Sequence, residues 1–205
     1  MKGMLVGLTI LVFLAVMCQC AKKPTPPVPP TDPGAYFPIN QDYAWTYVQL
    51  GTDCHPGAIS YVITAVSRSP RPEGSGWNFV SSASGDTSFV YRLGDTIFYQ
   101  PSVESPLPAY KVLVGPIKGG TSWKDSYPYD YEYTVMGLED LPSAVAGQTY
   151  RNCAKIRRTA SGLPTWNYFW WAPQYGKVKE AVFDQSGNCS EGAELQNLTK
   201  NPDFP

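Results

Sequence analysis

Two acidic residues stand at a spacing that could support acid–base chemistry. Asp130 and Glu132 alternate with tyrosines, so on a strand they share one face, with carboxylates roughly 6.5–7 Å apart. Acid and base in inverting glycosidases are separated by a similar ~6.5–9.5 Å. A solvated polar face gives the same pattern and is its commoner cause. We therefore predict no catalytic residue and keep a glycan-active enzyme as the alternative.

The sequence offers little support for a metal site or for a catalytic nucleophile. The one histidine, His55, adjoins Asp53 and Cys54, and neighbouring residues on a turn do not point at a common centre. No Gly-x-Ser-x-Gly elbow, P-loop or Gly-x-Gly-x-x-Gly motif is present. Glu139 and Asp140 fit a solvated turn. We expect no metal and no cofactor.

A basic and aromatic group offers the best candidate for binding. Lys155 and Arg157 alternate on one face of an expected strand and could hold a phosphate or carboxylate group. The next strand carries aromatic rings that could stack on a ligand, although core packing is their commoner role: Trp166, Tyr168, Trp170 and Trp171. We take these six residues as the possible ligand-binding set.

The N-terminus has the layout of a secretory signal that ends at cysteine. Lys2 precedes an apolar run, Met4–Met17, which fits a signal-peptide h-region and is short for a membrane-spanning helix. Cys18 and Cys20 then follow, which resembles the lipobox of bacterial lipoproteins, although neither has the usual small residue before it. We predict a signal peptide over 1–19 and lipidation (palmitate) at Cys20, with Cys18 the second choice and an uncleaved membrane anchor the remaining alternative.

A proline-rich segment comes directly after these cysteines. Six prolines between residues 24 and 33 fix φ and remove backbone donors, which favours extended polyproline II. We predict a lipidated stalk over 20–35 and one folded domain over 36–205, held at the bacterial cell envelope by its N-terminal lipid. The formal net charge of −1 gives no basis for binding nucleic acid.

Short aromatic and β-branched runs fill the expected domain, and no helical periodicity persists over three turns. The eleven expected strands are Tyr43–Leu50, Ala58–Ser67, Trp77–Ser82, Thr87–Arg92, Thr96–Gln100, Tyr110–Val114, Tyr129–Met136, Tyr150–Thr159, Thr165–Trp171, Lys177–Asp184 and Glu191–Thr199. Hairpin-length breakers separate them, which predicts an all-β fold made of a single antiparallel meander.

Two of these strands indicate how the sheet is covered. In Tyr129–Met136 the odd positions are apolar and the even positions include Asp130, Glu132 and Thr134, so one face should be aromatic and the other polar. The strand Thr165–Trp171 is aromatic on both faces. We expect it to lie centrally, with a flap, a loop or a ligand over its second face.

Three stretches resemble the TapB-like family, a group of uncharacterised secreted or lipidated bacterial β-proteins: "YFPINQDYAWTYVQ", "YTVMGLEDLPSAVAGQTYRNCAKI" and "YFWWAPQYGKVKEAV". The matching residues are Tyr36, Phe37, Pro38, Trp45, Tyr47, Gly137, Glu139, Gly147, Tyr150, Cys153, Ala172, Pro173, Gly176, Val178 and Lys179. Gln174 and Val145 depart from its Gly and Pro. The resemblance implies a strongly curved sheet or half-barrel, like that of periplasmic lipoprotein carriers, and carries no catalytic residue with it.

Three cysteines remain beyond the lipidation site, and an exported compartment permits disulfides. Counting eleven alternating strands places Cys54 and Cys153 at the same end of the sheet and Cys189 at the other. We therefore expect a Cys54–Cys153 bridge, with Cys189 free.

Together these features predict a membrane-anchored, non-catalytic lipoprotein that binds a hydrophobic ligand or a partner protein of the envelope. Few groups suited to catalysis are present, whereas the lipid and stalk serve placement. The alternative is an exported glycan-active enzyme or a carbohydrate-binding module.

Overall fold

The structure, a computed structural model, describes residues 28–38, 43–71, 74–101, 108–126 and 129–200. Apart from the short helix α2 (Pro33–Tyr36) and the 3-10 turn η1 (Thr52–Cys54), this part of the chain is built of strands. They are β1 (Tyr43–Leu50), β2 (Pro56–Arg71), β3 (Gly74–Ser81), β4 (Thr87–Leu93), β5 (Thr96–Gln100), β6 (Tyr110–Val114), β7 (Ser122–Asp125), β8 (Tyr131–Ser143), β9 (Gln148–Ala160), β10 (Trp166–Ala172), β11 (Gly176–Phe183) and β12 (Cys189–Lys200). The predicted all-β fold is confirmed.

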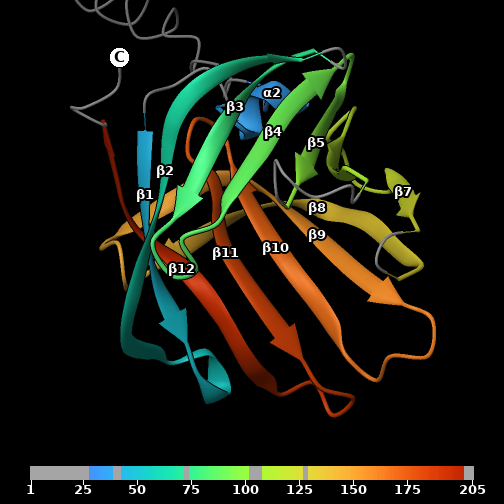
Figure 1. Ribbon diagram of the computed structural model, residues 1–205. Helices are drawn as coiled ribbons and strands as arrows, with labels where there is room; N and C mark the ends of the chain where they lie inside the picture. Colours follow the sequence, from blue (N-terminus) through green and yellow to red (C-terminus); the bar gives the residue numbers. More distant parts are fainter. Residues whose placement is uncertain (1–27, 39–42, 72–73, 102–107, 127–128, 201–205) are drawn as a thin grey trace, which may run out of the picture.

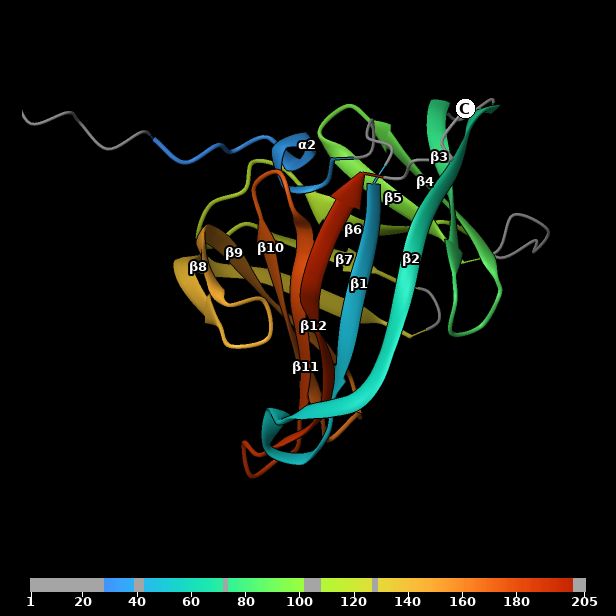
Figure 2. The same cartoon turned by 90° about the vertical axis from the view of Figure 1, so that its left-hand side faces the viewer.

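The sheet is an antiparallel meander that curls into a nearly closed barrel (Figures 1 and 2). Its two chain ends meet, because β1 pairs with β12 from Tyr43 opposite Lys200 to Leu50 opposite Gly192. The sheet therefore begins at β6 and ends at β7. Side chains bridge this seam: Asp125 Oδ2 on β7 accepts a hydrogen bond from the Lys111 backbone N–H on β6 at 2.7 Å.

The predicted disulfide is wrong, and a missed strand is the reason. The bridge joins Cys54 to Cys189, and Cys153 is free and buried. The four-residue strand β7, Ser122–Asp125, makes twelve strands instead of eleven. One extra strand reverses the direction of every later strand, which moves Cys189 to the end of the barrel that holds Cys54.

The hairpin of β8 and β9 is longer than expected and folds across its neighbours. Glu139 and Asp140, expected in a turn, lie within β8. Glu139 Oε1 accepts a hydrogen bond from the Trp170 indole at 2.6 Å, and Ser143 donates to Glu194 on β12. The hairpin thus covers Trp170 on the outer face of β10, so the expected flap is this part of the chain.

The folded domain begins earlier than the predicted boundary at residue 36. Asp32 caps α2 and forms an ion pair with Arg92 at 2.7 Å. The Thr31 carbonyl accepts from the Ile117 N–H, and the Ala35 carbonyl from the Gln174 N–H, each at 2.7 Å. The end of the predicted stalk therefore closes one end of the barrel, whereas the signal peptide, Cys18 and Cys20 lie outside the described residues.

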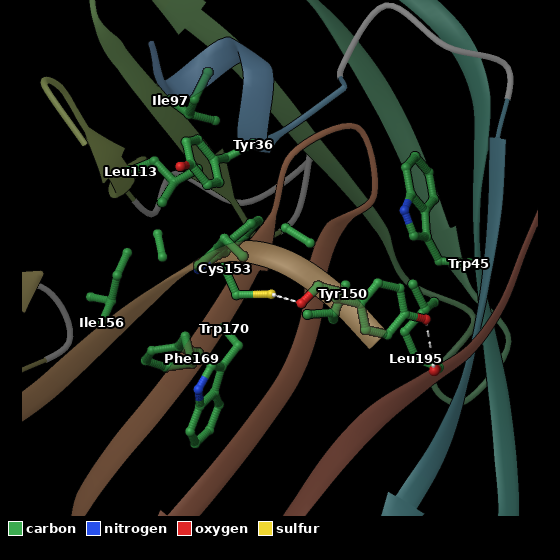
Figure 3. Close-up of a cluster of buried hydrophobic side chains, with 14 of the residues drawn as sticks. Tyr36, Trp45, Ile97, Leu113, Tyr150, Cys153, Ile156, Phe169, Trp170 and Leu195 are labelled. Carbon is green, nitrogen blue, oxygen red and sulfur yellow. Dashed lines mark hydrogen bonds between the residues drawn. The ribbon is translucent and has the colours of Figure 1, made fainter. Parts of the chain in front are cut away.

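Buried aromatic and aliphatic side chains fill the barrel beneath α2. Tyr36 is fully buried and lies near Ile97 and Leu113 (Figure 3). On β8 the predicted alternation is confirmed, because Tyr133 and Val135 are buried while Glu132 and Met136 are exposed. Each strand thus gives one face to the interior and one to the outside.

The Cys54–Cys189 bridge should contribute strongly to stability, because it closes a loop of 135 residues. We expect the double variant Cys54→Ala/Cys189→Ala to lose up to ~4–5 kcal/mol of unfolding free energy in the chain-entropy account. Urea unfolding measures this loss, and under reducing conditions the variant and the parent chain should converge. A bridge to Cys153 in non-reducing peptide maps would contradict the assignment.

Candidate functional site

A cavity of about 420 Å³ occupies the interior of the barrel, which we call the lumen. Its walls are mainly aromatic and aliphatic, with a few polar side chains, and they comprise Phe37, Pro38, Trp45, Tyr47, Ile63, Phe79, Ser81, Ser84, Asp86, Ser88, Val90, Tyr99, Pro101, Tyr110, Val112, Tyr133, Arg158, Phe169, Trp171, Gly176, Lys177 and Glu180. A cavity of this size and lining has the character of a small-molecule site.

The lumen has a closed end and a polar rim. Phe37 and Pro38, which follow α2, line it at the end that α2 covers. At the opposite end, the exposed residues Ser84 and Asp86 of the β3–β4 turn contribute to the lining. An elongated ligand would therefore meet apolar rings at one end and polar groups at the other.

Two aromatic residues of β1 are braced so that their rings face the lumen. The Trp45 indole N–H donates to the Tyr175 carbonyl at 2.7 Å, and the Tyr47 hydroxyl donates to the Lys177 carbonyl at 2.7 Å. Buried donors that lack partners are costly, so these bonds allow polar rings to sit in an apolar wall. They also tie β1 to the start of β11, across β12.

A bulge on β11 places an ion pair inside the lumen. Trp170 lies opposite Lys179 and Trp171 opposite Lys177, so one extra residue is inserted between them on β11. Residues three apart on a regular strand face opposite sides, but the bulge turns Lys177 and Glu180 to the same side. Their charged atoms lie 2.6 Å apart, and the quarter of each side chain that remains accessible belongs to the lumen lining.

The pair shifts the titration of both partners. The largest influence on each is burial, which by itself would favour the neutral forms. The attraction and hydrogen bond between them outweigh burial, so the pKa of Lys177 is raised and the pKa of Glu180 is lowered. Both groups are therefore charged at neutral pH.

Arg158 adds a second positive charge to the lumen wall. Its guanidinium lies 4.6 Å from the centre of the Tyr131 ring and 5.0 Å from that of Phe169. Its Nε atom is buried and has no hydrogen-bond partner. None of the ion pairs among the described residues involves Arg158.

Three tyrosines of the lumen stay neutral at physiological pH. Burial raises the pKa of Tyr47, Tyr110 and Tyr133, and a hydrogen bond and positive charge from Arg158 only partly offset this for Tyr133. Neutral phenols can donate or accept hydrogen bonds. The lumen therefore combines permanent charges with neutral polar groups on an aromatic wall.

Five of the six predicted binding residues share the outer face of β9 and β10, and the sixth, Trp171, faces the other way. Only Trp171 lines the lumen. Lys155 and Arg157 lie opposite Trp170 and Tyr168, on the outer face of the sheet. There the Lys155 ammonium sits 4.9 Å from the centre of the Tyr168 ring. Trp166 stacks on Phe183 at 6.4 Å between ring centres.

The remaining chemical candidates are dispersed. Asp130 and Glu132 are exposed and line a separate polar cleft of about 520 Å³ between β7, β8 and β9. Within the described ranges, no three His, Cys, Asp or Glu side chains gather as a metal site. Burial raises the pKa of the free Cys153 thiol to about 12, which makes it a poor nucleophile.

Sequence patterns could have indicated part of the lumen. Strict alternation on β1 would have selected Trp45 and Tyr47 as inward-facing residues. Alternation could not select Lys177 together with Glu180, because the bulge on β11 breaks it. Nor could it show that Arg158 points inward while Arg157 points outward, without a known face for β9.

Comparisons with known proteins support the fold. No family model and no curated protein matches this chain. The structure is similar to that of a presumed exported protein with a YmcC-like fold from Bacteroides fragilis, with a TM-score of 0.51 and 11% identity over 78% of this chain and 96% of that one. This likeness shows the same kind of curved β-fold, and membership of the TapB-like family stays a prediction.

Two further solved structures are more distant. A presumed lipoprotein from Parabacteroides distasonis has a TM-score of 0.38 and 11% identity over 84% of this chain and 100% of that one. MucB has a TM-score of 0.38 and 12% identity over 83% of this chain and 57% of that one. Within the part of the chain that is described, no helix is long and apolar enough to cross a membrane.

The Lys177–Glu180 pair should act as a unit. We expect Lys177→Met to lower the unfolding free energy by about 3 kcal/mol at neutral pH, because an uncompensated carboxylate remains in the wall. The double variant Lys177→Met/Glu180→Leu should recover most of that loss.

The stability defect of Lys177→Met should depend on pH in a defined direction. Because the pKa of Glu180 is lowered, the stability from its charged form is present above the ordinary pKa of a glutamate and is lost as pH falls through the lowered value. The defect of Lys177→Met should therefore shrink as the solution is acidified. Chemical unfolding across pH measures it, and equal losses in the single and double variants would show that the two charges are not coupled.

Proposed function

We propose that this protein is a lipid-anchored envelope protein that binds a hydrophobic small molecule in its lumen. The observation that carries the proposal is the aromatic cavity of about 420 Å³ inside an otherwise packed barrel. Native interiors are close-packed, and voids larger than a few waters are uncommon. A lumen of this volume with braced aromatic walls is better explained by a ligand than by imperfect packing.

A hydrophobic ligand is favoured over a partner protein as the occupant of this site. The lining rings come from strands around the whole barrel and face inward, where no protein surface could reach them. The aromatic residues on the outer face already pack against one another and contact the β8–β9 hairpin. The glycan-active enzyme is the competing hypothesis, but its two carboxylates lie on the exposed surface outside the lumen.

The anchoring part of the proposal rests on the sequence. An apolar run followed by cysteine and a proline-rich segment is the layout of a lipoprotein signal, and α2 shows where that segment joins the barrel. A diacylated or triacylated cysteine holds a protein stably at a membrane. The barrel would then present its lumen close to a supply of lipids.

Filling the lumen should abolish binding of an apolar probe. We expect Val112→Trp to reduce the affinity for 1-anilinonaphthalene-8-sulfonate or Nile red at least tenfold, because the indole occupies ligand space. Ile63→Trp, on β2, should do the same, because its side chain also lines the lumen. Probe fluorescence gives the affinity, and thermal unfolding shows whether each variant is folded.

A matched control comes from the outer face. Trp166→Ala and Tyr168→Ala remove two of the aromatic residues singled out from the sequence, and neither lines the lumen. They should leave probe affinity within twofold of the parent. If these variants lose the probe while the folded lumen variants keep it, the binding site is on the outer face.

The anchor has a direct test of its own. We expect mass spectrometry of the membrane-extracted protein to find acyl chains on Cys20 as the first residue. Cys20→Ser should release the protein from membranes or block its processing, whereas Cys18→Ser should leave it anchored. A soluble product that starts beyond Cys20 would contradict the proposal.

A further inference from the structure

Two cationic and two anionic side chains line the lumen: Arg158 and Lys177, and Asp86 and Glu180. Lys177 and Glu180 neutralise each other at 2.6 Å, so Arg158 is the cation of the described lining that has no ion pair. The exposed carboxylate of Asp86 lies at the rim. Glu180 is near enough to Arg158 to feel its charge, and Asp125 lies near Tyr133, but neither forms an ion pair with Arg158.

The Asp125 carboxylate already has a hydrogen-bond partner at the seam of the barrel, between β6 and β7. Its Oδ2 atom accepts the Lys111 N–H hydrogen bond that links β6 to β7. Glu180 is likewise held by Lys177. The two carboxylates around Arg158 therefore have other partners among the described residues, and a bound ligand could supply a direct counter-charge.

A guanidinium without a counter-charge in such a wall lowers stability, because part of its hydration is lost. Arginine does not lose its proton at accessible pH, so the charge is permanent. Stacking against Tyr131 and Phe169 offsets part of the lost hydration. The buried Nε–H of Arg158 still has no acceptor, which is unusual for a native structure and marks a place where a ligand atom would be stabilising.

The position of Arg158 also sets the direction in which an amphiphilic ligand would lie in the lumen. Tyr133 is its Cα partner, near the start of β8, and Arg158 is near the end of β9. The apolar rings of Phe37, Trp45 and Trp171 lie toward the end closed by α2. An apolar chain among those rings would leave its head group at the level of Arg158.

We propose that the ligand is an anionic, single-chain amphiphile whose carboxylate or phosphate head binds Arg158. This rests on the proposed function and specifies its ligand class. Arginine donates two parallel hydrogen bonds to either group, and Tyr133 adds a neutral hydroxyl beside it. A volume near the lower end of ligand pockets favours one acyl chain over two.

The test compares ligands that differ only in charge. The full-length anchored protein is placed in phosphatidylcholine nanodiscs, and empty nanodiscs are subtracted. Titrations with hexadecanoate, methyl hexadecanoate, hexadecyl phosphate and hexadecyltrimethylammonium are followed by tryptophan fluorescence, since Trp45 and Trp171 line the lumen. Acetate and inorganic phosphate show whether a head group alone is enough.

We expect hexadecanoate to bind on the order of 10-fold to 100-fold more tightly than its methyl ester, as a charge-assisted hydrogen bond predicts. Hexadecyl phosphate should behave like hexadecanoate, the cationic amphiphile should bind most weakly, and the free anions should not bind measurably. Arg158→Gln should bring carboxylate and ester to equal affinity, with Arg158→Lys between. Arg157→Gln, one residue away on the outer face, should change nothing.

The outcomes separate the two proposals. Equal binding of acid and ester to the parent protein overturns the anionic ligand and leaves a hydrophobic lumen site standing. A charge preference that survives in folded Arg158→Gln also overturns it. If no amphiphile binds, the proposed function itself fails. Binding of acetate or inorganic phosphate alone would replace the amphiphile with a small anion. The comparison of acid with ester needs no variant, so it holds even if Arg158→Gln does not fold.

Discussion

The pairing of β1 with β12 is the constraint on which the rest of this structure depends. A meander leaves its first and last strands as open edges, and their union turns the sheet into a curved wall around a lumen. Antiparallel closure requires an even number of strands. The short strand β7 supplies that parity, and the same parity brings Cys54 beside Cys189. The disulfide therefore fastens the two strands whose pairing closes the barrel.

The lumen persists because its polar atoms are fixed to the wall. Trp45 and Tyr47 direct their donors to backbone carbonyls near the start of β11, so their rings cannot collapse inward without losing buried hydrogen bonds. The bulge on β11 adds the Lys177–Glu180 ion pair to the lining, and these charged groups disfavour filling of the lumen by apolar side chains. Helix α2 closes one end with Tyr36, and the β8–β9 hairpin supports the outer face of β10.

Local patterns predicted the strands better than the site. Aromatic and β-branched runs located β1, alternation identified the buried face of β8, and the two-faced β10 correctly indicated a covering element. Four residues, Ser122–Asp125, were too short to register as a strand, and this one omission reversed the disulfide assignment. The aromatic density of β10 drew attention to its outer face. The inward set is assembled from distant strands, and its charged members depend on a bulge and on the direction that β9 faces.

Binding of an amphiphile inside the lumen can be tested by the contacts between a bound ligand and individual wall residues. Nuclear Overhauser effects between carbon-13-labelled hexadecanoate and the protein's methyl and indole protons would place the chain. We expect contacts from the acyl chain to Ile63, Val90 and Trp45, whose side chains line the lumen. Contacts confined to Trp166 and Tyr168 on the outer face would contradict binding inside the lumen.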